Sequence, residues 1–156
     1  MDEQDNICKK LRKESTDIQY FEKASEYAYQ YIKNIDSRNV KPTDSAIENL
    51  SYFKENLPAK GADTYEILRL LHEYASPATI AQTGGRYYGF VCGGAVPAAL
   101  AAKWLSVVWD QNAAMNVLSP VAAALEDVCE DWVVDLLRLP KETAAGLVGG
   151  SSAATI

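Results

Sequence analysis

The chain has 156 residues, of which 48% are hydrophobic and 23% are charged, a composition typical of one folded globular domain. Its 15 basic and 21 acidic residues give a formal net charge of −6, so a nucleic-acid-binding surface is not expected. The sequence shows neither an apolar run of membrane-spanning length nor an export signal in the charged segment 1–14. We therefore expect a cytoplasmic protein whose three widely spaced cysteines are free thiols and bind no metal.

The first predicted helix covers residues 16–35. Its apolar and small residues recur at steps of three and four, which places them on one face of a helix. Thr16 or Asp17 is expected to be the N-cap. The segment is rich in tyrosine, and packing against a neighbouring helix is the expected use of these rings in so acidic a chain.

Two shorter helices are predicted next, over residues 44–56 and 63–74. The first of these begins either at a capping box that starts with Ser45 or at a cap formed by Thr43. Their apolar faces are modest. We therefore expect these helices, together with the helix at 16–35, to need a larger body or a partner subunit to cover them.

The composition changes after residue 76, where glycine and alanine become frequent and charges become rare. Residues 87–91 are predicted to be extended, and a helix is predicted over 97–109 with Pro97 in its first turn.

A long amphipathic helix is predicted to follow, with Ser119 as N-cap and Pro120 in the first turn. It should end before Pro140. Residues 144–150 then resemble a short buried strand, which has no evident pairing partner in the rest of the chain. From this we expect the chain to be the front part of a longer protein.

Residues 149–152, Gly-Gly-Ser-Ser, follow the predicted strand and could bind a phosphate. Glycines allow a close approach of the backbone, and serine hydroxyls and helix N-terminal amides can hold an anion. A plain turn from strand to helix with a serine N-cap explains the pattern equally well. The spacing matches neither a P-loop nor a dinucleotide-binding motif.

Other candidate residues have competing structural explanations. The Trp109–Asn112 segment could hydrogen-bond a polar substrate, or it could be a capped helix end. His72, the single histidine, lies on a predicted helix and is expected to be structural. Cys92 lies between flexible glycine positions without a basic neighbour, and we interpret it as pocket lining rather than as a nucleophile.

Five stretches occur in one order with one set of gaps: GRYYGFV (85–91), PAALAA (97–102), WDQN (109–112), SPVAAALE (119–126) and GGSSA (149–153). The series resembles the N-terminal part of the pyridoxal-phosphate-dependent group II amino-acid decarboxylases, which include the aromatic-L-amino-acid, glutamate and 2,4-diaminobutyrate decarboxylases. The similarity covers the C-terminal half of the chain strongly and the first three predicted helices loosely.

The resemblance implies a fold class and two domains. The chain would be mostly α, with an N-terminal helical dimerisation segment at 1–76. Residues 77–156 would begin the α/β large domain of the aspartate-aminotransferase-like, fold type I architecture. The N-terminal helices would form a homodimer.

The resemblance also implies site residues. Ser151 and Ser152 would hold the phosphate of pyridoxal 5′-phosphate, supported by Gly150 and the amide of Ala153. The residues implied to line a substrate pocket are Phe90, Val91, Cys92, Gly93, Asn112 and Ala114.

The chain departs from the family in lacking counterparts of its Schiff-base lysine, its aspartate at the pyridine nitrogen and its ring-stacking histidine. His72 precedes the predicted phosphate turn, whereas the ring-stacking histidine of the family follows it. The parent reaction would remove CO2 from an amino acid bound as an external aldimine, and this chain alone is not expected to catalyse it. Two alternatives stay open: a non-enzymatic dimerisation or interaction module, and a part of another fold type I enzyme, either an aminotransferase or a lyase.

Overall fold

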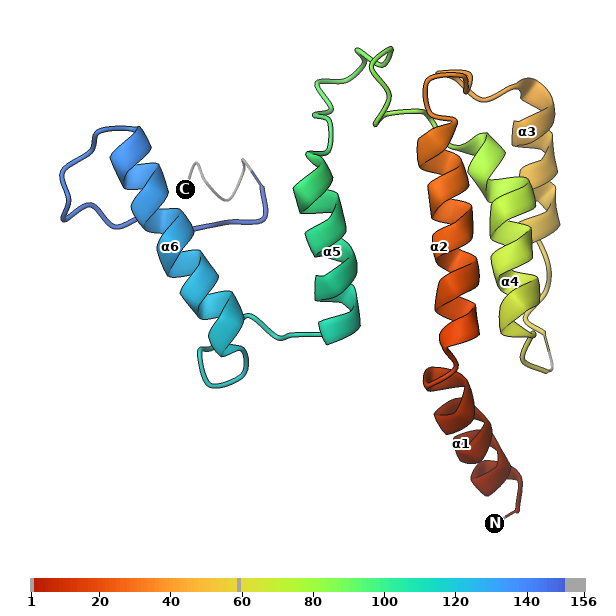
Figure 1. Ribbon diagram of the computed structural model, residues 1–156. Helices are drawn as coiled ribbons and strands as arrows, with labels where there is room; N and C mark the ends of the chain where they lie inside the picture. Colours follow the sequence, from red (N-terminus) through yellow and green to blue (C-terminus); the bar gives the residue numbers. More distant parts are fainter. Residues whose placement is uncertain (1, 59, 151–156) are drawn as a thin grey trace. The chain divides into compact units, whose positions relative to one another are not determined.

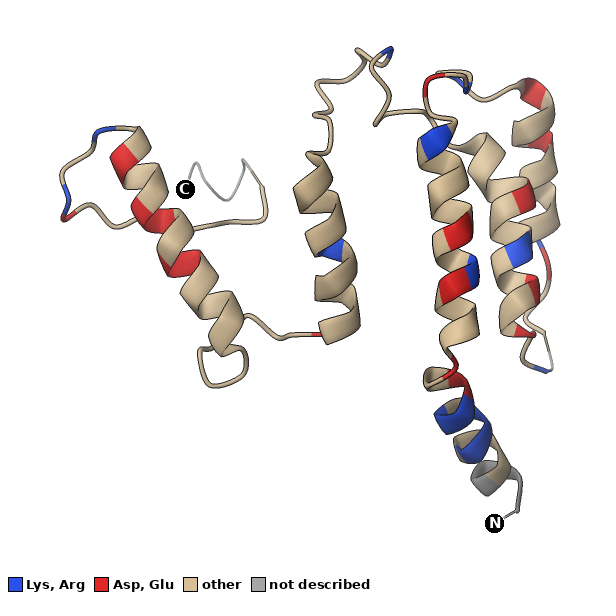
Figure 2. Cartoon of the chain, in the orientation of Figure 1, with Lys and Arg blue, Asp and Glu red and all other residues tan. Residues whose placement is uncertain are grey.

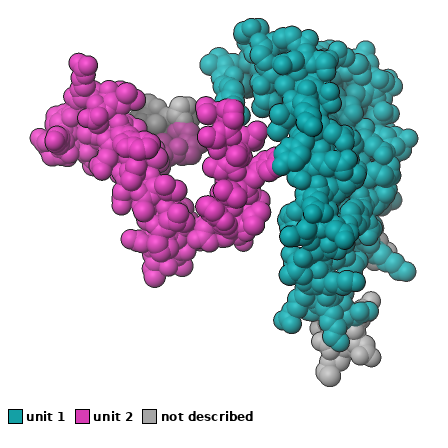
Figure 3. Space-filling model, in the orientation of Figure 1, with its two compact units in different colours: residues 1–95 teal, residues 96–156 magenta. Residues whose placement is uncertain are grey.

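The computed structural model describes residues 2–58 and 60–150 (Figure 1). These residues form helices joined by turns, without a β-strand, which confirms the prediction of a mostly helical chain. They belong to two compact units, Met1–Ala95 and Val96–Ile156 (Figure 3). The predicted domain boundary after residue 76 was based on composition and stays a prediction.

Helix α1, Asp2–Ser15, was not predicted from the sequence. Its last turn carries Arg12 and Lys13, where positive charge interacts favourably with the helix dipole. An ion pair of 3.6 Å links Lys10 to Glu14 one turn later. The high charge of the segment hid the helix, because only a narrow apolar stripe remains visible in the sequence.

Helix α2, Ile18–Lys33, confirms the first predicted helix and is two residues shorter at each end. Of the two predicted caps, the structure uses Asp17, whose Oδ1 accepts a hydrogen bond from the Gln19 backbone N at 3.1 Å.

Helix α3, Asp44–Glu48, begins at the Thr43 cap rather than at Ser45. The Thr43 hydroxyl accepts a hydrogen bond from the Ala46 backbone N at 3.3 Å. The chain then tightens into a 3₁₀ helix, Asn49–Phe53, so the predicted helix ends earlier than residue 56.

Helix α4, Thr64–Leu70, is capped by Asp63, which accepts from the backbone N atoms of Tyr65 and Glu66. It continues as a π-helical turn, Leu71–Ala75, and a short 3₁₀ turn, Ser76–Ala78. Together these segments occupy the predicted third helix and extend it.

Contacts between aromatic rings hold the first unit together, where α2 packs beside α4 (Figure 1). Ring centroids lie close together in the pairs Tyr20–Tyr65 at 4.7 Å, Tyr27–His72 at 3.8 Å and Tyr52–Tyr74 at 4.1 Å. Among the described residues, the buried hydrophobic side chains are those of Ala46 and Ala81. The helices of this unit are therefore held together by contacts between aromatic rings rather than by a wide aliphatic core.

The second unit contains α5, Pro97–Trp109, and α6, Pro120–Leu136, as predicted. Ser119 caps α6 as expected: its hydroxyl accepts from the Ala122 backbone N at 3.3 Å, and only 1% of the residue is exposed. The helix ends before Pro140.

Both predicted extended segments are wrong. Phe90 and Val91 have φ values of 54° and 56°, which is a left-handed turn rather than a strand. The described residues of 144–150 form no strand, and Leu147 and Val148 are 57% and 53% exposed. An isolated strand leaves its backbone donors and acceptors unpaired, and no neighbouring strand exists in the described part of the chain to pair with them.

Candidate functional site

The predicted pocket residues of the first unit lie in an exposed loop between the helices. Phe90 is 91% exposed and Val91 is fully exposed, so neither side chain is packed against the rest of its unit. Gly93 has nothing within 4 Å of the position that a Cβ would take. These residues are therefore accessible to a ligand or to another chain.

Cys92, in the same loop, has side-chain contacts. Its Sγ accepts from Gln82 Nε2 at 3.9 Å and donates to the Phe90 carbonyl at 3.8 Å. Partial burial of the Tyr87 ring, and then the neighbouring Cys92 thiol, raise the pKa of the Tyr87 hydroxyl above its ordinary value. The loop thus brings a thiol, an amide and a phenol together.

Asn112 and Ala114 lie in the second unit, in the turn between α5 and α6. The Asn112 side-chain oxygen accepts from the Ala114 backbone N at 3.0 Å, which is an Asx turn. Gln111 Nε2 donates to the Trp109 carbonyl at 2.9 Å. Both amides therefore hydrogen-bond within a polar turn, as the structural interpretation expects, but the C-cap of α5 is Asp110 rather than an asparagine.

The predicted phosphate turn falls at the edge of the described residues. Gly150 is exposed, and nothing lies within 4 Å of the position that a Cβ would take. Ser151, Ser152 and Ala153 lie outside the described residues. Hydroxyl and amide donors of this kind suit a phosphate.

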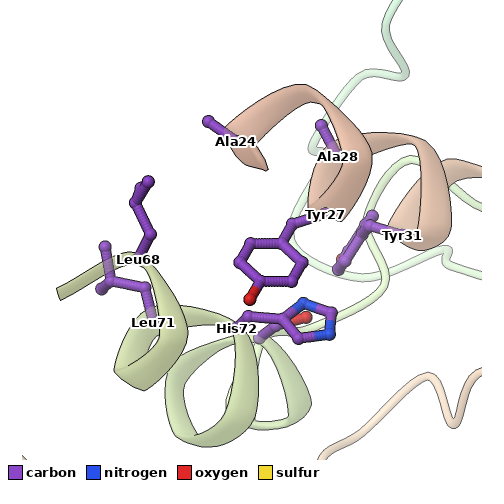
Figure 4. Close-up of a pocket in the computed structure, with 8 residues that line it drawn as sticks. Ala24, Tyr27, Ala28, Tyr31, Leu68, Leu71 and His72 are labelled. Carbon is purple, nitrogen blue, oxygen red and sulfur yellow. The ribbon is translucent and has the colours of Figure 1, made fainter. Parts of the chain in front are cut away.

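A cavity of about 280 Å³ lies between α2 and the end of α4 (Figure 4). Its lining includes the Tyr27 ring, which stacks on the His72 imidazole at 3.8 Å with an interplanar angle of 8°. Ala24 and Ala28 on α2 leave space beside the rings, and Leu68 closes the α4 side. The sequence analysis placed His72 in a structural role but did not predict this cavity.

Each tyrosine of this cavity has a cation over its ring. Lys23 Nζ lies 4.7 Å from the Tyr27 ring centre, and the Arg38 guanidinium carbon lies 4.3 Å from that of Tyr31. The Arg38 guanidinium also donates to the Ser76 carbonyl, and so ties the turn after α2 to the turn after α4. These contacts hold the helices in register around the cavity.

The cavity combines aromatic and aliphatic walls with a few polar groups, among them His72 and Ser76. Within residues 2–58 and 60–150, no three His, Cys, Asp or Glu side chains gather in a way that could hold a metal ion. No helix in these ranges is long and apolar enough to cross a membrane. The mostly aromatic and aliphatic lining suits packing between the helices or the binding of a small apolar group.

No family model matches the chain, and comparison with curated proteins and with solved structures finds no significant match.

Proposed function

We propose that this chain is the N-terminal part of a pyridoxal-phosphate-dependent group II amino-acid decarboxylase. The observation that carries the proposal is the series of five stretches between residues 85 and 153. Each stretch alone has moderate specificity, and it is their order and spacing along the chain that resemble the family. In this proposal the intact enzyme removes CO2 from an amino acid, and this chain supplies the phosphate turn, parts of a substrate pocket and a dimerisation segment.

The character of α5 supports a larger parent domain. This helix carries one charged side chain, Lys103, as Figure 2 makes visible. Leu105, Val107 and Val108 are 52%, 65% and 71% exposed in the described structure. A helix that is apolar on all sides is normally buried within a large domain. The rest of a fold type I large domain is a suitable cover for it.

The cofactor would be bound through its phosphate by Gly150, Ser151, Ser152 and the amide of Ala153. A glycine at position 150 suits this role, because it lets a ligand approach the backbone closely. Pyridoxal phosphate would supply an electron sink for the reaction. The residues of this chain would orient the cofactor by its phosphate end.

The homodimer in this proposal uses the N-terminal helices, and it places the loop Phe90–Gly93 at the pocket of the neighbouring subunit. The full exposure of Phe90 and Val91 supports this role, because a side chain that serves a second subunit does not pack in its own.

The nucleotide sequence beyond codon 156 tests the proposal directly. We expect an open frame that encodes a histidine, an Asp-x-Ala segment and a His-Lys motif. Absence of such a frame would overturn the enzyme proposal. For the chain in hand, none of its lysines matches the family's lysine motif. Pyridoxal phosphate followed by borohydride should therefore give no stoichiometric adduct at a single lysine, as judged by peptide mass spectrometry.

A second candidate function is a non-enzymatic interaction module. It is favoured by the exposed apolar face of α6, where Val121, Leu125, Val128, Trp132 and Leu136 are 42% to 81% exposed at helical spacing. Capture of a full-length homologue by the purified chain, without a downstream coding frame, would favour this module over the enzyme.

A further inference from the structure

Arg38, in the turn after α2, carries a buried hydrogen-bond donor without a partner. Its Nε atom is enclosed by protein, and no acceptor for it lies within residues 2–58 and 60–150. A buried donor that belongs to a charged group is costly to leave unpaired, because it has lost its hydration and gained nothing in return. Such a donor therefore marks a place where a water or an anion is bound.

The rest of the Arg38 guanidinium is held in place by the chain itself. Its carbon lies over the Tyr31 ring, 4.3 Å from the ring centre. Nη2 donates to the Ser76 carbonyl, and it also lies 3.4 Å from Thr79 Oγ1. These contacts occupy one nitrogen and fix the plane of the group. The Nε edge of the planar fork is therefore oriented before any ligand arrives.

A cavity of about 200 Å³ adjoins Arg38, where the turn after α2 meets the start of α3 and the 3₁₀ turn after α4. Its lining consists of Arg38, Asn39, Pro42, Thr43, Ala46 and Pro77. These residues supply a cation, an amide and a hydroxyl, but no carboxylate. One water needs about 10 to 15 Å³ of such volume, so the cavity has room for a larger polar group.

The positive charge beside this cavity is not neutralised within the described part of the chain. Arg38 takes part in none of its ion pairs, and neither does Arg86. The Arg86 guanidinium donates to the Arg38 carbonyl, which brings a second cation close to the first. Asp36 and Asp44 are near in sequence, but neither forms an ion pair with Arg38 or lines the cavity. An oriented guanidinium of this kind attracts an anion.

We infer that this cavity, the Arg38 pocket, binds a small oxyanion of the phosphate type, either inorganic phosphate or a phosphate monoester. Arg38 Nε donates to one oxygen of the anion, and the exposed Asn39 amide donates to another from the rim. The Thr43 hydroxyl oxygen accepts from the Ala46 backbone N at 3.3 Å, and its proton can turn to a third oxygen. Three donors suit the several oxygens of a phosphate better than the two of a carboxylate. The inference goes beyond the proposed decarboxylase and does not depend on it.

NMR of the arginine side chains in the full chain tests the site. Arg38→Lys identifies the Arg38 Nε–H signal, because this variant loses that signal and keeps the charge. Inorganic phosphate is titrated in slightly acidic buffer, with sodium chloride holding the ionic strength constant. We expect the Arg38 signal to shift and saturate. The signals of Arg12 on α1 and of Arg138 after α6 are the controls, and they should not follow the same curve.

A matched pair of variants tests the chemistry of the Arg38 pocket. Asn39→Asp places a carboxylate at its rim and leaves the contacts of Arg38 intact, so the dissociation constant from the same titration should rise by at least about tenfold. Asn56→Asp adds the same charge at another exposed position of the first unit and should leave the constant unchanged. Because both side chains are exposed, circular dichroism should show equal helix content in the two variants.

Glycerol 3-phosphate, titrated in parallel, distinguishes the two sources of the anion. A smaller dissociation constant than that of inorganic phosphate supports a phosphate monoester, and a larger one supports the free ion. Ser151→Ala with Ser152→Ala removes the hydroxyls of the predicted phosphate turn and should leave the Arg38 titration unchanged. No saturable shift at Arg38 with either compound, or equal constants in Asn39→Asp and Asn56→Asp, overturns the Arg38 pocket. The decarboxylase proposal is decided separately, by the sequence beyond codon 156.

Discussion

Arg69 on α4 holds two carboxylates of the same helix. Its Nε donates to Glu66 Oε2 at 2.9 Å, and its Nη1 donates to Glu73 one turn later. The hydrogen bond from Arg69, followed by its positive charge, lowers the pKa of Glu66 below its ordinary value of 4.5. Because all three groups are partly exposed, solvent weakens this cluster relative to a buried one.

We predict that Arg69→Gln raises the pKa of Glu66 towards its ordinary value. A carboxyl with a lowered pKa in the folded state stabilises the fold above its ordinary pKa and loses this effect as the pH falls through the lowered value. The stability advantage of the wild type over the variant should therefore be present at neutral pH and shrink in acid below about 4.5. Titration of the side-chain carboxyl carbons by NMR measures the shift.

Glu26 provides the control for this prediction. Its pKa is lowered chiefly by the hydrogen bond from Lys23 at 2.8 Å on α2, which Arg69 does not touch. Its titration should be the same in both proteins. An unchanged Glu66 pKa in Arg69→Gln would contradict the assigned hydrogen bond.

At the scale of the elements, the C-terminus of α6 is closed by a Schellman motif. Arg138 takes a left-handed conformation with φ of 54°, and its backbone N donates to the Asp135 carbonyl at 3.0 Å. The Leu139 backbone N donates to the Val134 carbonyl at 3.0 Å. Glycine is the usual residue at the left-handed position, because a Cβ there crowds the backbone.

We predict that Arg138→Gly stabilises α6 by about 0.5 to 1 kcal/mol, since the conformation is kept and the Cβ penalty is removed. The free energy of unfolding from urea denaturation measures the gain. Arg138→Ala removes the same charge but keeps the Cβ, so it should show no such gain. Equal gains in both variants would mean that the lost charge, rather than the backbone conformation, explains the effect.

The sequence predictions were accurate for elements that depend on neighbouring residues, and they failed for features that depend on residues far apart in the chain. The helices at 97–109 and from Ser119 onwards were predicted closely, because periodicity, a first-turn proline and a cap are read within one segment. The predicted strand at 144–150 was wrong, because a strand needs a second strand to hydrogen-bond its backbone, and the sequence of the segment does not show whether one is present. The Tyr27–His72 stack was missed for the same reason: it joins residues 45 positions apart in the sequence.

At the scale of the whole molecule, the two units are joined through a loop without regular structure. Tyr88 and Phe90 are each 91% exposed, and the loop runs on without a helix until Pro97. Neither ring is packed within its own unit. A protease binds its substrate as an exposed, extended segment, and this loop can supply one. Helices resist cleavage until they unfold locally.

We predict that chymotrypsin at a low ratio of enzyme to substrate first cleaves after Tyr88 or Phe90. The product that contains α2 and α4 should then persist as a folded unit, because the aromatic contacts between these segments lie entirely within Met1–Ala95. Intact-mass spectrometry over time identifies the first cut. Phe90→Ala with Tyr88→Ala should slow it without changing circular dichroism, since both rings are exposed. First cleavage within α2 or α6 would show that these helices open more readily than the loop binds the protease.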